Sequence, residues 1–368
     1  MTAQTEQFTE TSAATAGRTI ISVDAMGGDE GPATVVAGIS RSAHKNAQIG
    51  FILHGPKDQL QKLVDKRKNL EGICEIRDAA DVVSMEDKPA QVLRSGKSTS
   101  MWSAIESVRN GEADVCVSCG NTGALMLMSV VRLRKLDGVY RPAIAVLWPS
   151  RNAQGFNVLL DAGADIRADA KDLMQYALMG ISYARNGFGL TRPRVGLLNV
   201  GTEEHKGRAE LKEAYELINA NAKRADFEFV GFVEGKDLPG DTVDVIITDG
   251  FTGNVALKTG EGTATLIGEL LRKAFRHTVW SRMASLLAYT SMQRLKERID
   301  PRRVNGGVFL GLNGTVVKSH GAADATGVSS AVKLAFQLAQ SGFSEKLAAR
   351  VASAAMLSDE DENESRSE

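Results

Sequence analysis

The sequence predicts a doubly wound α/β/α fold with a mostly parallel sheet and a protruding helical hairpin. Apolar strand-like runs alternate with amphipathic helical segments from Arg18 to Leu357, a pattern typical of parallel sheets covered by helices. Glycine-rich turns follow several of these runs. The stretch 261–300 is helical throughout and interrupts the alternation, which predicts the hairpin.

Short runs rich in Val, Ile, Leu and Phe are the predicted strands, and amphipathic segments between them are the predicted helices. Ligands of such folds bind beyond the carboxyl ends of the strands. The predicted strands are residues 20–23, 49–54, 73–77, 115–118, 144–147, 156–160, 195–200, 227–232, 243–248 and 307–310. The predicted helices include 33–45, 101–109, 124–135, 171–186, 208–220 and 331–340.

Length and composition fit a single α/β domain over residues 18–357 that includes the hairpin 261–300. A chain of 368 residues with 43% hydrophobic residues can bury a sizeable core. We expect disordered tails at 1–17, which is rich in Thr and Ala, and at 358–368, which is acidic. No signal-peptide core and no run of 18 apolar residues occurs, so a cytoplasmic location is expected.

Charge and cysteine content exclude several classes of function. The net charge of -1 gives no overall field that would attract nucleic acid. Cys116 and Cys119 form a CxxC, but it ends a predicted strand and no nearby His completes a metal site. We therefore expect neither a metal nor a redox site, and no cofactor.

The first glycine turn is a candidate anion site. The predicted strand 20–23 leads through Asp24 into Gly27 and Gly28, and Pro32 opens the following helix. Glycines let the backbone approach a ligand, and free helix N–H groups favour an anion. An ordinary βα turn is the alternative. Asp24 and Asp29 would repel phosphate unless a cation or proton intervenes, so they are also candidates for orienting their neighbours.

Two further turns share the pattern Gly-x-Thr-Gly directly after a predicted strand. They are 120–123, which contains Asn121 and Thr122, and 250–253, which contains Thr252 and Gly253. Such turns present successive N–H groups and a hydroxyl, which suit phosphate or a carbonyl oxygen that gains charge. The alternative is that Thr122 and Thr252 only cap helices.

Other strand ends add polar and cationic candidates. Asp161 directly follows a predicted strand, and Asn199 lies at the end of another, where the segment 199–207 leads to a helix. The turn 314–321 carries Lys318 and His320. Lys318 and His320 are the best placed positive groups for an anionic substrate, and two residues apart on an extended segment they share a face. Solvated loop residues are the alternative for both. His205 is a second candidate acid that the sequence does not separate from His320.

The predicted hairpin is apolar and strongly basic. Nine Lys and Arg between residues 272 and 303 face only Glu297 and Asp300, an excess of +7. Its apolar stripe must be buried, either against a second copy of the chain or on an anionic membrane surface. The residues at the tip are Trp280, Met283, Leu286 and Leu287.

Six motifs taken in order resemble the bacterial phosphate acyltransferase family, PlsX. They are 23–29, 120–124, 160–164, 198–203, 248–254 and 318–321. The resemblance implies a fold like the phosphotransacetylase and isocitrate dehydrogenase group, a homodimer and peripheral membrane association. It also implies transfer of a fatty acyl group from acyl-(acyl carrier protein) to inorganic phosphate. The acyl phosphate product feeds phosphatidic acid synthesis, with a glycerol-3-phosphate acyltransferase as a possible downstream partner.

This chemistry assigns expected roles to the turn residues. Lys318 and His320, with the amides of Gly27–Gly28 and Asn121–Thr122, are expected to hold phosphate, and Asn254 or amides near Gly253 are expected to face the thioester oxygen. Two other functions stay open. One is an NAD(P)-dependent dehydrogenase, which the missing Gly-x-Gly-x-x-Gly disfavours, and the other is a membrane-docked scaffold for the carrier protein. The expected substrate-binding residues are Asp24, Asp161, Asn199, Asp249, Thr252 and Gly253.

Overall fold

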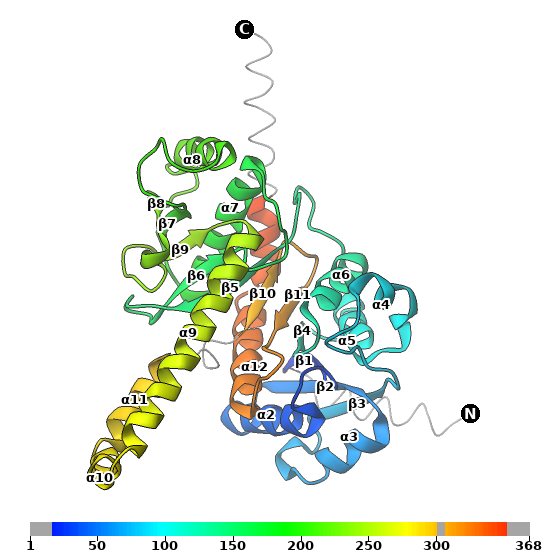
Figure 1. Ribbon diagram of the computed structural model, residues 1–368. Coiled ribbons are helices and arrows are strands. Elements are labelled where there is room, and N and C mark those ends of the chain that lie inside the picture. The colour runs from blue at the N-terminus through cyan, green and yellow to red at the C-terminus, as the bar shows by residue number, and fades with distance from the viewer. Residues whose placement is uncertain (1–16, 300–305, 352–368) are drawn as a thin grey trace. The chain divides into compact units, whose positions relative to one another are not determined.

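A computed structural model describes residues 17–299 and 306–351 (Figure 1). The predicted tails lie outside these residues except for Gly17, and so does the last residue of the predicted hairpin. Contacts between Cα atoms divide the chain into two compact units. Of the described residues, unit 1 contains 17–144, 181–191 and 306–351, and unit 2 contains 145–180 and 192–299. The single domain over 18–357 stays a prediction.

The strands of unit 1 are mainly parallel. Their order is β3-β2-β1-β4-β11-β10, and only β10 and β11 run antiparallel to each other. Asp24 and Lys318, the last residues of β1 and β11, both pair with Ser118 at the end of β4. The carboxyl ends of these three strands therefore lie level at one edge. The bounds are β1 Thr19–Asp24, β2 Ile49–Gly55, β3 Cys74–Asp78, β4 Val115–Ser118, β10 Gly307–Leu310 and β11 Thr315–Lys318.

Helices cover both faces of these strands. Ser22 in β1 donates a hydrogen bond to the carbonyl of Ala104 in α5, whereas Val317 in β11 lies beside Leu334 of α12 near Gly306. Side chains alternate along a strand, and the register places Ser22 and Val317 on opposite faces. Helix α2 packs against α12, and α6 against α5. The helices are α2 Gly31–Lys45, α3 Lys57–Val64, α4 Pro89–Ser95, α5 Ser100–Arg109, α6 Thr122–Leu133 and α12 Ala325–Gln340.

A buried histidine lies on the α5 face of unit 1. His54 has no exposed surface, and its two ring nitrogens lie 2.9 Å from Ser22 Oγ and 2.8 Å from Ser103 Oγ. Burial, with a smaller contribution from the positive charge of Arg77, lowers the pKa of His54 to about 3. The imidazole is therefore neutral in the folded protein at any pH near neutrality.

We expect this histidine to make the folding stability depend on pH. An unfolded His has a pKa of about 6.5, so the unfolded chain binds a proton between about pH 6.5 and 3 that the folded chain does not. The contribution of neutral His54 to the free energy of unfolding is therefore complete above pH 6.5 and is lost as the pH falls toward 3. Between pH 7 and 5 the free energy of unfolding should drop by about 2 kcal/mol more in the native protein than in His54→Gln. Urea unfolding at the two pH values measures this, and equal drops would contradict it.

Unit 2 has its own set of strands, in the order β5-β6-β9-β7-β8. β5 and β6 are antiparallel, and the remaining pairs are parallel. Buried Leu159, Leu198 and Ile246 belong to its apolar core. The strands are β5 Ala143–Pro149, which begins at the unit boundary, β6 Phe156–Leu160, β7 Arg194–Leu198, β8 Glu228–Val233 and β9 Val245–Ile247. Two of its helices are α7 Ala170–Phe188, which ends in unit 1, and α8 Ala209–Asn221.

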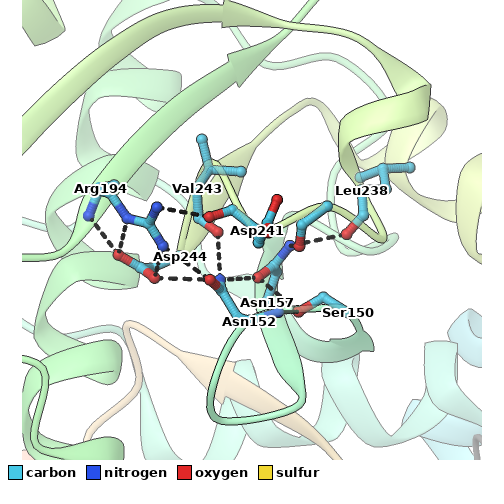
Figure 2. Close-up of polar contacts among 9 residues, drawn as sticks. Ser150, Asn152, Asn157, Arg194, Leu238, Asp241, Val243 and Asp244 are labelled. Atoms are coloured by element: carbon cyan, nitrogen blue, oxygen red, sulfur yellow. Dashed lines mark hydrogen bonds and ion pairs between the residues drawn. The ribbon is translucent and has the colours of Figure 1, made fainter.

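A polar network holds the amino-terminal ends of β7 and β9 together (Figure 2). Arg194 binds Asp244 at 2.8 Å and the side-chain oxygen of Asn152 at 2.9 Å. The amide of Asn152 donates to the carbonyl of Val243 at 2.7 Å and to Asn157 at 2.5 Å. These side chains bind one another at the amino ends of the parallel strands, so the opposite, carboxyl ends are the place for a ligand in unit 2.

The predicted hairpin is formed by three helices, α9 Gly250–Arg276, α10 Val279–Leu287 and α11 Tyr289–Ile299. α9 already starts at the turn after β9, and only Gly250 and Gly253 in it are buried. Within unit 2, α10 and α11 lie at the far end of α9 from the strands (Figure 1). Trp280 is 79% exposed and Leu287 is 89% exposed. Leu286 belongs to α10, but its side chain lies outside the described part.

The mostly parallel α/β prediction is confirmed, with local corrections. Residues 315–318 were expected to be part of a glycine-rich turn, but they form β11 between β4 and β10. Helix α12 begins at Ala325 and not at residue 331, because Asp324 accepts hydrogen bonds from the amides of Thr326 and Gly327. The sequence did not indicate either feature, because the four residues of β11 and the first turn of α12, which contains Gly327, show little hydrophobic periodicity. No helix in the described residues has the length and hydrophobicity of a membrane span.

Candidate functional site

Three loops meet at the carboxyl edge of β1, β4 and β11 in unit 1. Asp29 in the first loop donates its amide hydrogen to the carbonyl of Gly321 in the third, at 2.8 Å. Gly28 has a φ of +97°, and a Cβ there would lie 2.9 Å from both Gly321 O and Cys119 Cβ. A Cβ on Gly27 would lie 2.6 Å from the amide nitrogen of Gly120. Only glycine allows this approach. We call this region the three-loop site.

Cationic and hydroxyl groups lie at the three-loop site. Lys318 is 8% exposed, and its Nζ donates to the carbonyl of Cys119 at 3.2 Å and to that of Ser319. His320 Nδ1 accepts the amide hydrogen of Ala322 at 3.1 Å, which puts the proton of the neutral ring on Nε2. Within the described residues, the buried hydroxyl of Ser319 has no hydrogen-bond partner. This set of donors suits an anion.

A buried carboxylate shapes the first loop. Asp24 accepts hydrogen bonds from the hydroxyls of Ser100 and Ser118, both at 2.7 Å, and from the amide of Met26 at 3.3 Å. Burial raises the pKa of Asp24, and these hydrogen bonds oppose the rise. A Cβ on Gly27 would lie 2.7 Å from Asp24 Oδ2. Asp24 thus contacts and orients the Gly27 loop, and its expected role in substrate binding stays a prediction.

The sequence offered Thr122 and Thr252 as residues that cap helices, but other residues cap α6 and α9. Asn121, and not Thr122, caps α6, because its Oδ1 accepts the amide hydrogen of Ala124 at 3.1 Å. Its Nδ2 donates to the carbonyls of Met85 and Asp87. The side chain of Asn121 is therefore engaged, and its backbone and that of Thr122 remain as the candidate phosphate donors. At the start of α9, Asp249 caps the helix and Thr252 does not.

A cavity of about 370 Å³ lies at the carboxyl ends of β7 and β9 in unit 2. Three predicted substrate-binding residues, Asn199, Asp249 and Thr252, line it together with apolar side chains. Asn199 accepts the amide hydrogen of Val200 and donates to the carbonyl of Lys206. Arg208 forms an ion pair with the buried Asp249. No sequence pattern indicated Arg208, because the pairing joins residues of two different turns.

The remaining predicted residues of unit 2 surround the start of α9. Asp161 is fully buried and accepts backbone hydrogen bonds from residues 163, 164 and 165 at 2.8 to 3.1 Å. A Cβ on Gly253 would overlap the carbonyl oxygen of Asp161, so α9 approaches this turn closely. Asn254 is exposed, and its side chain makes no hydrogen bond within the described residues. Its amide is therefore accessible to a ligand.

The two histidines that the sequence left undecided lie in different units. His320 belongs to the three-loop site, whereas His205 is exposed in the loop after β7 of unit 2. The CxxC cysteines are both buried, and burial raises the pKa of both thiols. Within residues 17–299 and 306–351, no group of three or more His, Cys, Asp or Glu residues could hold a metal ion.

Comparison with known proteins agrees with this geometry. The model of a family described as "Fatty acid synthesis protein" matches residues 19–346. A phosphate acyltransferase of Ruegeria sp. (strain TM1040) is 73% identical over 353 residues, covering 96% of this chain and 94% of the relative. A phosphate acyltransferase of Paracoccus denitrificans (strain Pd 1222) is 72% identical over 333 residues, covering 90% of both chains.

Solved structures with a similar fold include a phosphotransacetylase from Streptococcus pyogenes, with a TM-score of 0.59 and 15% identity over 92% of this chain and 99% of that chain. A phosphotransacetylase from Staphylococcus aureus has a TM-score of 0.55 and 14% identity over 93% of this chain and all of that one. At such identity the likeness shows the fold, which confirms the predicted class. The family match and the identities above 70% show that the chain belongs to the fatty acid synthesis protein family, the phosphate acyltransferase (PlsX) family that its motifs resemble.

Proposed function

We propose that the chain transfers a fatty acyl group from acyl-(acyl carrier protein) to inorganic phosphate in phospholipid synthesis. The products are an acyl phosphate and the free carrier thiol, and a glycerol-3-phosphate acyltransferase then consumes the acyl phosphate. The observation that carries the proposal is the buried Lys318, whose Nζ donates to the carbonyl of Cys119, the residue that Gly28 also approaches. The names of the relatives, phosphate acyltransferases, support it.

The reaction requires little acid or base catalysis. A phosphate oxygen attacks the thioester carbonyl carbon, a tetrahedral intermediate forms, and the C–S bond breaks as the electron pair leaves with sulfur. A thiol of pKa about 8–9 departs readily as thiolate. Phosphate is itself the nucleophile, so no serine or cysteine of the protein has to carry the acyl group. The protein has to position two reactants and stabilise the oxyanion.

In this proposal the three-loop site holds phosphate. Lys318 supplies the positive charge, and the backbone N–H groups of Gly27–Gly28 and Asn121–Thr122 supply directed donors. His320 adds Nε2–H, because its Nδ1 already accepts a hydrogen bond. The Ser319 hydroxyl is a further donor that the sequence did not single out. The side chains of Lys318, Ser319 and His320 thus add to a site built mainly of backbone N–H groups.

The acyl donor is assigned to unit 2. The accessible amide of Asn254 faces the thioester oxygen, and the polar rim of Asn199, Asp249 and Thr252 contacts the arm that carries the acyl group. The apolar part of the same cavity, which includes Leu198 and Leu211, suits the methylene groups of such an arm.

The hairpin is assigned to an anionic membrane surface, to which the homodimer attaches peripherally. Leu266 and Leu270 on α9 are each 55% exposed, and Met283 on α10 is 53% exposed. Apolar side chains flanked by cations are typical of helices that lie in a membrane interface. Burial of this stripe in the dimer is the alternative.

One assay tests the proposed reaction. Palmitoyl-carrier protein is incubated with the protein, with and without inorganic phosphate, while released thiol and acyl hydroxamate are measured. We expect thiol release only with phosphate, together with hydroxamate formation. Release without phosphate would mean a thioesterase. Carrier binding without thiol release would mean a scaffold, and hydride transfer to NAD(P) would mean a dehydrogenase.

A further inference from the structure

Unit 1 contains a strongly basic cavity that lies apart from the three-loop site. It has a volume of about 670 Å³ and is bordered by α2, the turn from α3 into the 3-10 helix Lys68–Leu70, and the start of α12. Among the described residues that line it, none is acidic. We call it the basic hollow. Its charged and polar lining includes Arg41, His44, Lys66, Arg67, Lys68 and Asn69.

The cations of the basic hollow are not neutralised by neighbours. Residues 41–45 and 62–68 contain six Lys or Arg and one acidic residue, Asp65, in a chain of net charge -1. Asp65 accepts a hydrogen bond from Gln61 at 2.7 Å. Within the described part, Lys66, Arg67 and Lys68 are exposed and make no ion pair. The charge therefore faces solvent and is available to an acidic partner.

The basic hollow shares two helices with the three-loop site. α2 starts at Gly31, three residues after Gly28, and Arg41 lies ten residues further on. At 1.5 Å per residue this is about 15 Å along the helix. Ala325, which also lines the hollow, is the first residue of α12 and follows the Gly321 loop. Arg41 of the basic hollow thus lies about three helical turns along α2 from the end that follows the Gly28 loop.

We propose that the basic hollow docks the acidic surface of the acyl carrier protein. This inference rests on the proposed acyl donor. The cations are exposed on long side chains of α2 and of the turn and 3-10 helix after α3, and the buried Ser40 in the same lining already donates its hydroxyl hydrogen to Asn69. Such a spread suits the face of a protein, whose attraction increases the association rate and weakens with salt.

Charge reversal separates the basic hollow from the other basic surface, the hairpin. The test variant, called the hollow variant, is Arg67→Glu with Lys68→Glu. A matched control is Lys333→Glu with Lys346→Glu, which makes the same charge change at exposed positions of unit 1. A third variant, Lys273→Glu with Arg276→Glu, reverses charge on α9. Circular dichroism and thermal unfolding of all variants establish that each is folded.

Binding of fluorescent holo-carrier protein is measured by anisotropy at low and physiological salt. We expect the hollow variant to bind at least tenfold more weakly than the native protein, with a smaller salt dependence, and the Lys333/Lys346 control to bind normally. In steady-state kinetics the KM for acyl-carrier protein should rise by a similar factor, with kcat and the KM for phosphate unchanged.

Several results would overturn the docking surface. Unchanged carrier binding in the hollow variant would do so, and so would a loss confined to the α9 variant. Equal losses in the hollow variant and the Lys333/Lys346 control would indicate only a general effect of charge. Loss of binding to phosphatidylglycerol vesicles, with carrier binding intact, would assign the hollow to a membrane instead. Failure of the proposed reaction can be distinguished from failure of the docking proposal. In that case the native protein itself would release no thiol in response to phosphate.

Discussion

Replacing Lys318 with alanine is expected to lower kcat/KM for phosphate by about 10²–10³-fold, the usual cost of losing one directed donor to a developing or bound negative charge. Lys318 is almost completely buried at the end of β11, and its Nζ lies 3.2 Å from the carbonyl of Cys119 in the loop after β4. Phosphate saturation curves at fixed acyl-carrier protein measure the effect.

The control for Lys318→Ala is Lys333→Ala, which removes an exposed lysine from α12 in the same unit. It should leave both the phosphate KM and the thermal unfolding temperature unchanged. The KM for acyl-carrier protein should stay near native in Lys318→Ala itself, because the variant removes a phosphate contact only. Normal phosphate kinetics in Lys318→Ala would refute the assigned role.

Combining Trp280→Glu with Leu287→Glu is expected to release the protein from anionic vesicles. Both side chains are largely exposed at the tip of the hairpin, and burying an apolar side chain of this size contributes about 1.5–3 kcal/mol. Losing two such contributions, and adding two negative charges near anionic lipid, should weaken vesicle binding by more than 100-fold. Co-sedimentation with phosphatidylglycerol vesicles measures the loss.

A matched control places the same charges elsewhere on unit 2. Ile166 is 72% exposed and Val230 is 42% exposed, so Ile166→Glu with Val230→Glu should leave vesicle binding intact. Analytical ultracentrifugation should find the same oligomeric state, proposed to be a dimer, for the Trp280/Leu287 variant and the native protein. Dissociation of the dimer with unchanged vesicle binding would instead assign the tip to the dimer core.

Local sequence patterns predicted much of the fold. The runs 115–118, 156–160 and 307–310 coincide with β4, β6 and β10, because buried strands need continuous apolar side chains whatever surrounds them. The glycine turns were readable for a similar reason, since Gly28 adopts a positive φ that other residues disfavour. The hairpin was readable from its stripe of apolar residues, although α9 begins eleven residues earlier than predicted.

The three-loop site, the cavity of unit 2 and the basic hollow were harder to predict, because each depends on contacts between turns that are distant in sequence. The sequence placed Gly27, Asn121 and Lys318 in turns or at their edges, but β11 and the order of the strands bring their loops together. The ion pair of Arg208 with Asp249 joins residues 41 positions apart. The basic hollow arises only because α2 packs against the turn after α3.

By itself, the sequence determined the class of fold, the glycine turns at strand ends and the family, since each of these depends on residues that are close along the chain. The tertiary structure decided the strand order of each unit, which side chains cap the helices and which cations gather in one hollow. Burial, capping and charge clustering are set by neighbours in space, and a parallel sheet places neighbours in space far apart in sequence.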